Sequence, residues 1–185
     1  MELYESLQTY QPYNEQEARD REIMLALLKT QPDIFTRENQ LAHFTASSWL
    51  LNKTHDKVLM IYHNIYQSWS WTGGHADGET DLLSVAKREA MEETGVTDIA
   101  AVTDEIYSIE TITVDGHEKR GSYVSSHLHL NVTYLLEADE EEVLRVKPDE
   151  NSGVRWFSLG EALEASTEPW MVERIYKKLN AKLSS

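Results

Sequence analysis

The sequence contains no cysteine. That absence excludes a disulfide framework, thiol catalysis and a zinc site built on cysteine thiolates. Proline and glycine are also sparse, with four and eight residues among 185, and the chain has no linker rich in proline, glycine or serine. A chain of this length without such a linker suits one compact domain, or a core domain with an extension.

Long hydrophobic runs are missing as well. The longest candidates, residues 48–51 and 58–62, are too short for a transmembrane helix and fit strands instead. Residues 1–5 lack the basic start and the apolar stretch of a secretion signal. We therefore expect a soluble protein with no membrane partner and a cytoplasmic location, with which the absence of cysteine agrees.

Positive charge is in short supply, because 17 Lys and Arg residues face 32 Asp and Glu residues and the formal net charge is -15. A chain this acidic repels nucleic acid and anionic membranes at long range, so we expect neither as a partner. A polyphosphate substrate would be repelled in the same way unless bound cations offset its charge. Sites for divalent metal ions are therefore the first feature to look for.

Hydrophobic periodicity predicts helices at the two ends of the chain. Residues 15–29 form a predicted helix that ends before Pro32, within a helical extension over residues 1–41. Ser158 and Glu161 have the spacing of a capping box that opens a helix. A last amphipathic helix is predicted to begin at Pro169.

The middle of the chain has the apolar patterning of β-strands. Residues 44–51 and 57–62 are predicted to form a hairpin. Residues 99–114 and 123–136 are predicted to form two long strands, joined by a polar loop over residues 115–122. Strands in the middle, one internal helix and helical ends together predict an α/β sandwich or an α+β layout.

The internal helix carries the most informative residues. Asp81 is its predicted N-cap and Gly95 its predicted terminator. At about 100° per residue, Glu89, Glu92 and Glu93 fall within an arc of roughly 100° on this helix. Three carboxylates on one stripe repel each other unless a cation lies among them, and such hard oxygen ligands suit Mg²⁺ or Mn²⁺.

The competing interpretation of this stripe is a solvated helix face. Charge runs are common on helices, and Arg88 could simply pair with its acidic neighbours. Gly73 and Gly74 favour the metal site, because they lie at a predicted strand end shortly before the helix. Glycines there would bring backbone carbonyls and amides beside the acidic face.

This segment resembles the Nudix box, which runs glycine, five residues, glutamate, seven residues, Arg-Glu, an apolar residue, any residue, Glu-Glu, any residue, glycine and an apolar residue. The residues from Arg88 to Val96 match the second half throughout, and Gly74 lies at the expected distance before Arg88. The match departs at the first glutamate position, where Thr80 stands and Glu79 comes one residue early.

The resemblance to the Nudix hydrolase family implies a fold and an activity. The implied fold is an α/β/α sandwich around a mixed sheet over residues 42–185, with residues 1–41 as a helical extension packed on it. The implied activity is metal-dependent cleavage of a phosphoanhydride bond in a nucleoside diphosphate linked to another group, or in a similar small diphosphate. We expect a small-molecule substrate, and the chain is compatible with a homodimer.

The resemblance also assigns roles to residues. Glu89, Glu92 and Glu93 are expected to bind one to three Mg²⁺ or Mn²⁺ ions, helped by the backbone at Gly74. Either Glu92 or Glu93 accepts the proton of the attacking water, and the choice between them stays open. Arg88 orients the carboxylates, and in the family the first glutamate of the box mainly orients this arginine.

Two other functions compete with hydrolysis. One is a Nudix-fold binding or regulatory module without catalysis, which the intact Glu89, Glu92 and Glu93 oppose and Thr80 leaves open. The other is a diphosphate isomerase of the same fold. That branch of the family uses a catalytic cysteine, which this chain lacks.

Two further segments contain charged candidates. Glu150 precedes a short predicted strand and resembles the place where many Nudix enzymes add one more carboxylate ligand from a loop, although a surface position is as good an interpretation. Lys119 and Arg120 lie in the predicted polar loop. Arg120 is a candidate for binding the substrate phosphates, against the alternative of an exposed turn.

Histidines and tryptophans give a third set. His127 and His129 share one face of a predicted strand and are candidates for contacting the substrate, although strand histidines are often a buried hydrogen-bonded pair. His75 directly follows the two glycines and is assigned to the substrate site on that ground. Trp69 and Trp71 share a strand face too, and we expect them in the core rather than in a base-stacking platform.

Overall fold

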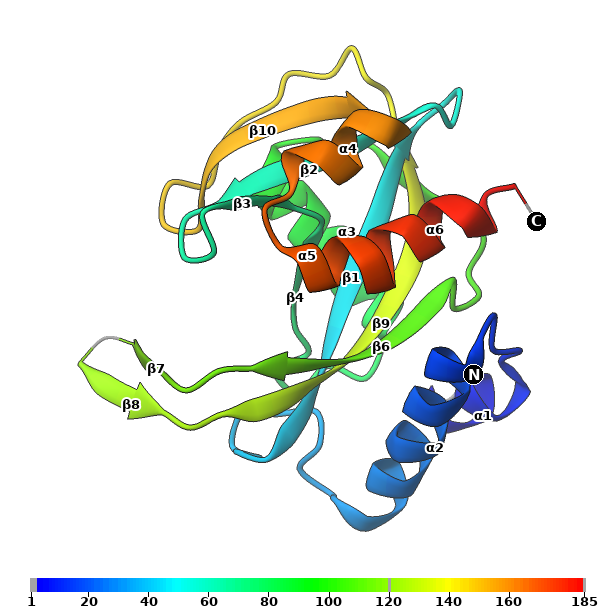
Figure 1. Ribbon diagram of the computed structural model, residues 1–185, viewed down its shortest axis with the longest axis vertical. Coiled ribbons are helices and arrows are strands. Elements are labelled where there is room, and N and C mark those ends of the chain that lie inside the picture. The colour runs from blue at the N-terminus through cyan, green and yellow to red at the C-terminus, as the bar shows by residue number, and fades with distance from the viewer. Residues whose placement is uncertain (1–2, 120, 185) are drawn as a thin grey trace.

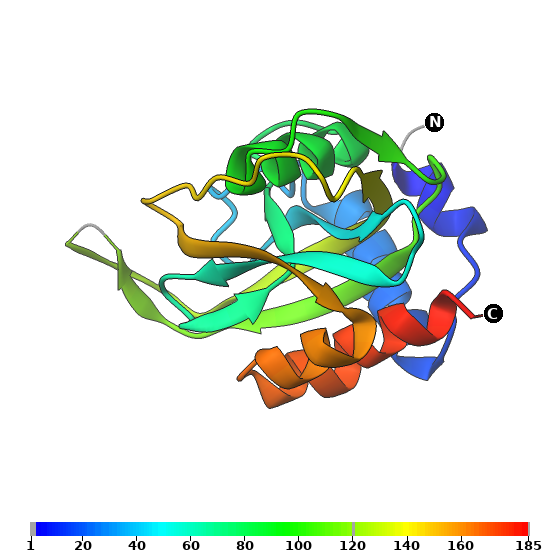
Figure 2. The ribbon, with the colours of Figure 1, turned by 90° about the horizontal axis from the view of Figure 1, so that it is seen from above.

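The computed structural model describes residues 3–119 and 121–184. Helices cover both faces of a mixed β-sheet, so the domain has an α/β/α arrangement (Figures 1 and 2). Within these residues no helix is long and apolar enough to cross a membrane. The helices are α1 (Leu3–Thr9), α2 (Glu15–Thr30), α3 (Leu82–Thr94), α4 (Leu159–Ala165), α5 (Pro169–Met171) and α6 (Lys177–Lys182), with a π-helical turn over Val172–Tyr176 between α5 and α6.

Eight strands of the described chain form one sheet in the order β10-β2-β1-β9-β5, with β3 beside β2, β4 beside β1 and β6 beside β9. The pairing of β1 with β9 is parallel and the other pairings are antiparallel, so the sheet is mixed. The strands are β1 (Ala42–Asn52), β2 (Lys57–His63), β3 (Ser68–Ser70), β4 (Thr72–His75), β5 (Ile99–Ala101), β6 (Ser108–Val114), β7 (His117–Lys119), β8 (Ser122–Val124), β9 (His127–Ala138) and β10 (Asn151–Ser158).

Several predictions from local patterns are confirmed. The α/β sandwich is present, and the helix predicted at residues 15–29 is α2. The predicted hairpin is β1 and β2, which pair antiparallel through Leu51 and Val58. Ser158 and Glu161 form the predicted capping box at the start of α4. The helix, the hairpin and the capping box depend on residues close in sequence, which is why their patterns sufficed.

The single long strand predicted over residues 99–114 is wrong. β5 and β6 pair with the same strand, β9, but at different places along it: Ile99 lies opposite Ala138, and Ser108 lies opposite Thr133. The residues between them leave the sheet in a turn, where the backbone amide of Glu105 donates to the Thr103 hydroxyl at 3.2 Å. Pairing with β9 therefore divides the segment that was predicted as one strand.

The second long strand and the polar loop also need correction. The predicted strand 123–136 is divided into β8 and β9, and the predicted loop 115–122 contains β7 and the start of β8. β7 and β8 form a two-stranded arm that projects from the ends of β6 and β9 (Figure 1). The backbone amide of Gly116 donates to the Ser126 hydroxyl at 2.9 Å, which joins the two sides of the arm at its base.

β1 is buried on both faces, and its two faces belong to two different cores. Phe44 and Ala46 belong to the core that contains Val85, Ala86 and Ala90 of α3. Trp49 and Leu51 belong to the core under the C-terminal helices. Alternate strand residues point to opposite faces, so the odd-numbered residues of β1 face away from α3. Figure 2 shows α3 and the C-terminal helices on opposite sides of the sheet.

A buried ionic cluster joins α2 to the sheet and to α6. Lys178 Nζ lies 3.1 Å from Glu17 Oε1 and 3.0 Å from Glu110 Oε1, and both carboxylates are fully buried. The Tyr10 hydroxyl donates to Glu17 Oε2 at 2.7 Å. Buried charges need such partners, because removing one leaves the others uncompensated. The cluster packs α2 against the core, while the domain boundary between residues 41 and 42 stays a prediction.

The two tryptophans before the glycine pair lie where the sequence predicted. Trp71 is only 8% exposed and belongs to the core under the C-terminal helices, and Trp69 packs against the same core. Their place in this core confirms the prediction of a structural role.

Candidate active site

Local capping fixes where α3 begins and ends. The Asp81 carboxylate accepts from the Ser84 amide at 3.2 Å and from the Ser84 hydroxyl at 2.6 Å, as expected of an N-cap. Gly95 ends the helix with φ 77°, a left-handed conformation that favours glycine, and its amide donates to the Met91 carbonyl. The predicted cap and terminator are both confirmed, and they set which residues face the sheet.

The three glutamates of α3 differ in their exposure to solvent. Glu92 is exposed and Glu89 is half-buried, whereas Glu93 is only 3% exposed. The backbone amide of Gly73 donates to Glu93 Oε2 at 3.0 Å. Burial, together with the nearby charges of Glu150 and Glu89, raises the pKa of Glu93 to about 8. A buried carboxyl of this kind requires either a proton or a cation near neutral pH.

Gly74 lies directly against the second glutamate of the stripe. A Cβ atom built on Gly74 would lie 2.5 Å from Glu89 Cδ, so a larger residue could not keep this contact. Burial raises the pKa of Glu89, and Arg88 partly offsets this by donating from Nη2 to Glu89 Oε1 at 3.1 Å. Arg88 thus makes a contact that can orient a carboxylate, and its role in the site stays a prediction.

Lys147 links the helix to the loop that carries Glu150. Its Nζ lies 3.1 Å from Glu92 Oε2 and 3.0 Å from Glu150 Oε1. Burial opposes the charge of Lys147, but hydrogen bonds to Glu150 and Glu92 outweigh it and hold its pKa above the usual range. Glu150 is therefore brought beside the acidic stripe, and its role as a metal ligand stays a prediction.

The charge pattern of the sequence did not indicate Lys147, because lysine is not a ligand for a hard cation. Its spacing of three residues before Glu150 was the available clue. Its ammonium pairs with Glu92 and Glu150, two carboxylates that would also attract a divalent cation.

The segment departs from the Nudix box at Thr80, and the turn around this residue has its own local structure. Glu79 Oε1 accepts from the backbone amides of Thr80 at 2.7 Å and of Asp81 at 2.9 Å. The Glu79 carboxylate therefore caps the turn that leads into α3. Arg88 donates to Glu89, one residue along the same helix.

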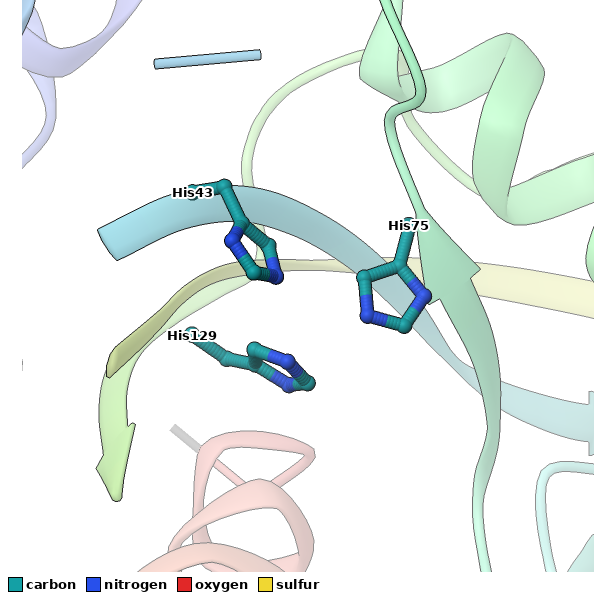
Figure 3. Close-up of side chains that lie close together, drawn as sticks. All are labelled: His43, His75 and His129. Atoms are coloured by element: carbon teal, nitrogen blue, oxygen red, sulfur yellow. The ribbon is translucent and has the colours of Figure 1, made fainter. Parts of the chain in front are cut away.

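The predicted substrate contacts His75, His127 and His129 come together, but on the sheet face that points away from α3. His75 pairs with Thr45 of β1, and His129 pairs with His43. One ligand atom from each of His43, His75 and His129 lies within 4.8 Å of the others (Figure 3). Contact of these histidines with substrate stays a prediction, and Arg120 lies outside the described residues.

His43 is the member of this group that the sequence did not indicate. It is 4% exposed, and burial lowers the pKa of its ring. The parallel pairing of β1 with β9 places it level with His129, and no local pattern reveals a pairing between strands so far apart in sequence.

The donor chemistry of the α3 site fits a hard divalent cation. The carboxylate oxygens come from one helix face and belong to Glu89, Glu92 and Glu93. Gly74 has no side chain, so its backbone can lie directly against Glu89. Oxygen ligands of this kind suit Mg²⁺ or Mn²⁺. A cation would also relieve the repulsion that, with burial, raises the pKa of Glu93.

The chain is similar to known proteins in its sequence pattern and in its fold. The family model described as NUDIX domain matches residues 41–179. No protein of curated function matches the sequence. Among solved structures, a C. elegans Ap4A hydrolase in a binary complex has 19% sequence identity to this chain and a TM-score of 0.56. The match covers 76% of this chain and 97% of that one.

Two further structures have the same fold. A NUDIX family hydrolase from Clostridium perfringens has 22% identity and a TM-score of 0.53, covering 75% of this chain and 97% of its own. A MutT protein from Methanosarcina mazei Go1 has 16% identity and a TM-score of 0.54. That match covers 77% of this chain and 95% of the MutT chain. At these identities the neighbours establish the fold alone.

Proposed function

Because this chain belongs to the Nudix hydrolase family, a family of pyrophosphohydrolases, we propose that it is a divalent-metal-dependent hydrolase of small diphosphates. The bond cleaved is a phosphoanhydride in a nucleoside diphosphate linked to another group, or in a similar compound. The observation that carries this proposal is that Glu93 accepts from the Gly73 amide and Glu89 lies against Gly74, on the helix that also carries Glu92. A solvated helix face would not bury Glu93.

Mg²⁺ or Mn²⁺ is the cofactor that the donor set favours. Glu89, Glu92 and Glu93 would hold it, with the Gly74 backbone and Glu150 as further ligands. When bound, the ion supplies positive charge that offsets the phosphates and favours ionisation of a water molecule. In a chain with a net charge of -15 this local positive charge also permits an anionic substrate to approach.

The chain's own residues perform the proton transfer. Either Glu92, exposed and 3.1 Å from Lys147, or the buried Glu93 accepts a proton from water. The water oxygen forms a bond to phosphorus, the anhydride bond breaks, and the leaving phosphate keeps the bridging oxygen. Two phosphate-terminated products result. Arg88 holds Glu89 in place and takes no part in bond formation.

The test is a panel of nucleotide sugars, ADP-ribose, dinucleoside polyphosphates and nucleoside triphosphates with Mg²⁺ or Mn²⁺, followed by product analysis. Glu92→Gln and Glu93→Gln should each reduce turnover about 100-fold, the scale of a lost proton acceptor. The helix should persist, because Gln and Glu have similar helix propensity. Glu164→Gln, on an exposed position of α4, is the matched control and should keep full activity. Wild-type turnover in both active-site variants contradicts the proposal.

A binding or regulatory module is the second candidate, and Thr80 is the observation that favours it. Glu79 is engaged in capping the turn before α3, so the box has no glutamate in the usual place to orient Arg88. Such a module would bind diphosphates with metal and release no product. If hydrolysis is the native function, Thr80→Glu changes turnover only modestly, whereas a large gain indicates that the natural chain is catalytically impaired.

Three other expectations carry into this proposal. Substrate contacts by His75, His127, His129 and Arg120 are tested by the change in KM that each substitution causes. A homodimer is tested by the sedimentation behaviour of the protein. A cytoplasmic location is tested by fractionation of cells that express the untagged chain.

A further inference from the structure

Four of the chain's seven histidines meet at one place on the sheet, on the face that points away from α3. They come from three strands: His43 from β1, His75 from β4, and His127 and His129 from β9. Ring centroids of neighbouring members lie 4.9 to 5.2 Å apart. Imidazole nitrogens are ligands for Zn²⁺, Cu²⁺ and Ni²⁺ rather than for Mg²⁺.

Two of these rings have a defined orientation. His43 Nδ1 lies 3.1 Å from the Asn39 carbonyl oxygen, and His127 Nδ1 lies 2.8 Å from the Ser125 carbonyl oxygen. A carbonyl oxygen only accepts, so Nδ1 carries the proton in both rings. In the neutral form Nε2 then presents a lone pair. Metal-binding histidines are typically held in this way, by a second hydrogen bond from the other ring nitrogen to a backbone carbonyl.

The Nε2 atom of His43 points to a ligand independently of the clustering. His43 is 4% exposed, and within the described residues its Nε2 is buried without a hydrogen-bond partner. Leaving a buried acceptor unsatisfied is unfavourable, so native structures rarely keep one without a reason. A bound cation would accept the lone pair that no protein donor reaches.

The distances suit a small tetrahedral ion. Ligand atoms of His43, His75 and His129 lie within 4.8 Å of one another (Figure 3). Two nitrogens bound to one zinc ion in tetrahedral geometry are about 3.3 Å apart. His127 Nε2 and His129 Nε2 are already 3.2 Å apart, and the donors of His43 and His75 would have to approach to this spacing when an ion binds.

We infer that His43, His75 and His129 form a second metal site, for a zinc-class divalent ion, with His127 as the nearest fourth donor. The site joins β1, β4 and β9 and is distinct in chemistry from the carboxylates of α3. His75 directly follows Gly74, so an ion held here also fixes the end of the strand whose Gly73 amide binds Glu93. The bound ion therefore stabilises the fold next to the candidate active site.

The competing structure is a chain of imidazole hydrogen bonds, in which His129 Nε2 donates to His127 Nε2. The experiment uses the full-length protein, stripped with chelator, in excess Mg²⁺ so that the carboxylates are occupied. Zn²⁺ is titrated against a competing zinc indicator, and Co²⁺ is added in parallel to record visible absorption. We expect one Zn²⁺ per chain and the intense Co²⁺ bands of tetrahedral coordination.

Substitutions assign the binding to the cluster. His75→Gln and His129→Gln should each weaken Zn²⁺ binding about 100-fold. Loss of a residue that only supports a metal ligand already costs about 10–100-fold in affinity, and loss of the ligand itself should cost at least as much. His55→Gln, in the turn at the far end of β1, and the Glu92→Gln/Glu93→Gln double variant should bind Zn²⁺ like the wild type. Far-ultraviolet circular dichroism of each metal-free variant checks that it folds.

Three outcomes overturn the inference. Zn²⁺ binding that the histidine variants keep, or that only the glutamate variant loses, places the ion elsewhere. Absence of stoichiometric binding and of tetrahedral Co²⁺ bands in the wild type shows that the rings only bond to one another. Because no substrate is used, these results are independent of whether the proposed hydrolysis is found.

Discussion

Gly74 lies against Glu89 in the candidate active site and leaves no room for a Cβ atom, which has a direct consequence for substitution. In Gly74→Ala the new Cβ would lie 2.5 Å from Glu89 Cδ and displace this carboxylate. A displacement of about 1 Å can cost about 100-fold in rate, so we expect a loss of that size in turnover. The measurement is steady-state hydrolysis at saturating Mg²⁺.

Gly160→Ala is the matched control for that substitution. A Cβ on Gly160 meets no atom within 4 Å, and Ala favours the helix α4 in which it lies. Its activity and stability should be at least those of the wild type. Equal activity in the two alanine variants would show that the position of Glu89 does not matter.

Glu93 gives a pH prediction for the metal-free protein. Its pKa is about 8 in the folded state against 4.5 for an ordinary glutamate, so the folded state binds its proton more tightly than the unfolded state. This proton binding contributes fully to the free energy of unfolding below about pH 4.5, and the contribution is lost as the pH rises through about 8. The free energy of unfolding should therefore fall over this range, and fall less in Glu93→Gln.

Urea unfolding in the presence of a chelator, repeated across this pH range, measures the effect. The difference between the wild type and Glu93→Gln isolates Glu93 from the other carboxyl groups, which titrate in both proteins. A difference that stays constant with pH contradicts the buried, protonated glutamate. Added Mg²⁺ should flatten the wild-type profile, because a cation replaces the proton.

At the scale of elements, the ionic cluster on Lys178 decides how firmly α2 and α6 are attached. Lys178→Met leaves the fully buried Glu17 and Glu110 without their shared ammonium. Breaking a buried ion pair from one side costs about 3–5 kcal/mol, so we expect a loss of that order in the free energy of unfolding. Equilibrium urea unfolding at neutral pH is the measurement.

The neighbouring lysine provides the control for this element. Lys177 makes an exposed pair with Glu173 on the same C-terminal segment, and exposed pairs contribute about 0.2–1 kcal/mol. Lys177→Met should therefore change stability little. Similar losses in both variants would mean that the buried cluster does not attach the N-terminal helices to the core.

The elements that the sequence predicted are those whose determinants are local. Asp81 and Gly95 cap α3 through contacts within the helix ends, and the stripe of glutamates follows from helical geometry alone. The division of residues 99–114 into two strands depends on where each piece pairs with β9. Local periodicity contains no information about that long-range pairing.

The same distinction applies to the sites. Glu89 and Glu93 were predictable because Gly74 and the glutamates lie within one short motif. His43 could not be predicted, because it meets His129 only through the parallel pairing of two strands that lie far apart in the sequence. Lys147 reaches Glu92 by a similar long-range approach.

For the molecule as a whole, we expect the acidic surface and the acidic stripe of α3 to respond to cations in different ways. A chain with a net charge of -15 is stabilised by any salt that screens its self-repulsion. A binding site among Glu89, Glu92 and Glu93 requires a divalent ion in particular. The distinction matters because only the second response supports a catalytic metal.

The thermal unfolding midpoint with Mg²⁺, compared with NaCl at matched ionic strength, tests the proposed metal site most directly. Free ion at 100 times its Kd should add about 2.7 kcal/mol to the stability of the wild type. We predict that the wild-type midpoint rises well above the salt control and that Glu89→Gln/Glu93→Gln loses most of this excess. An equal rise with Mg²⁺ in both proteins would contradict the account, because the stripe would then be only a solvated face.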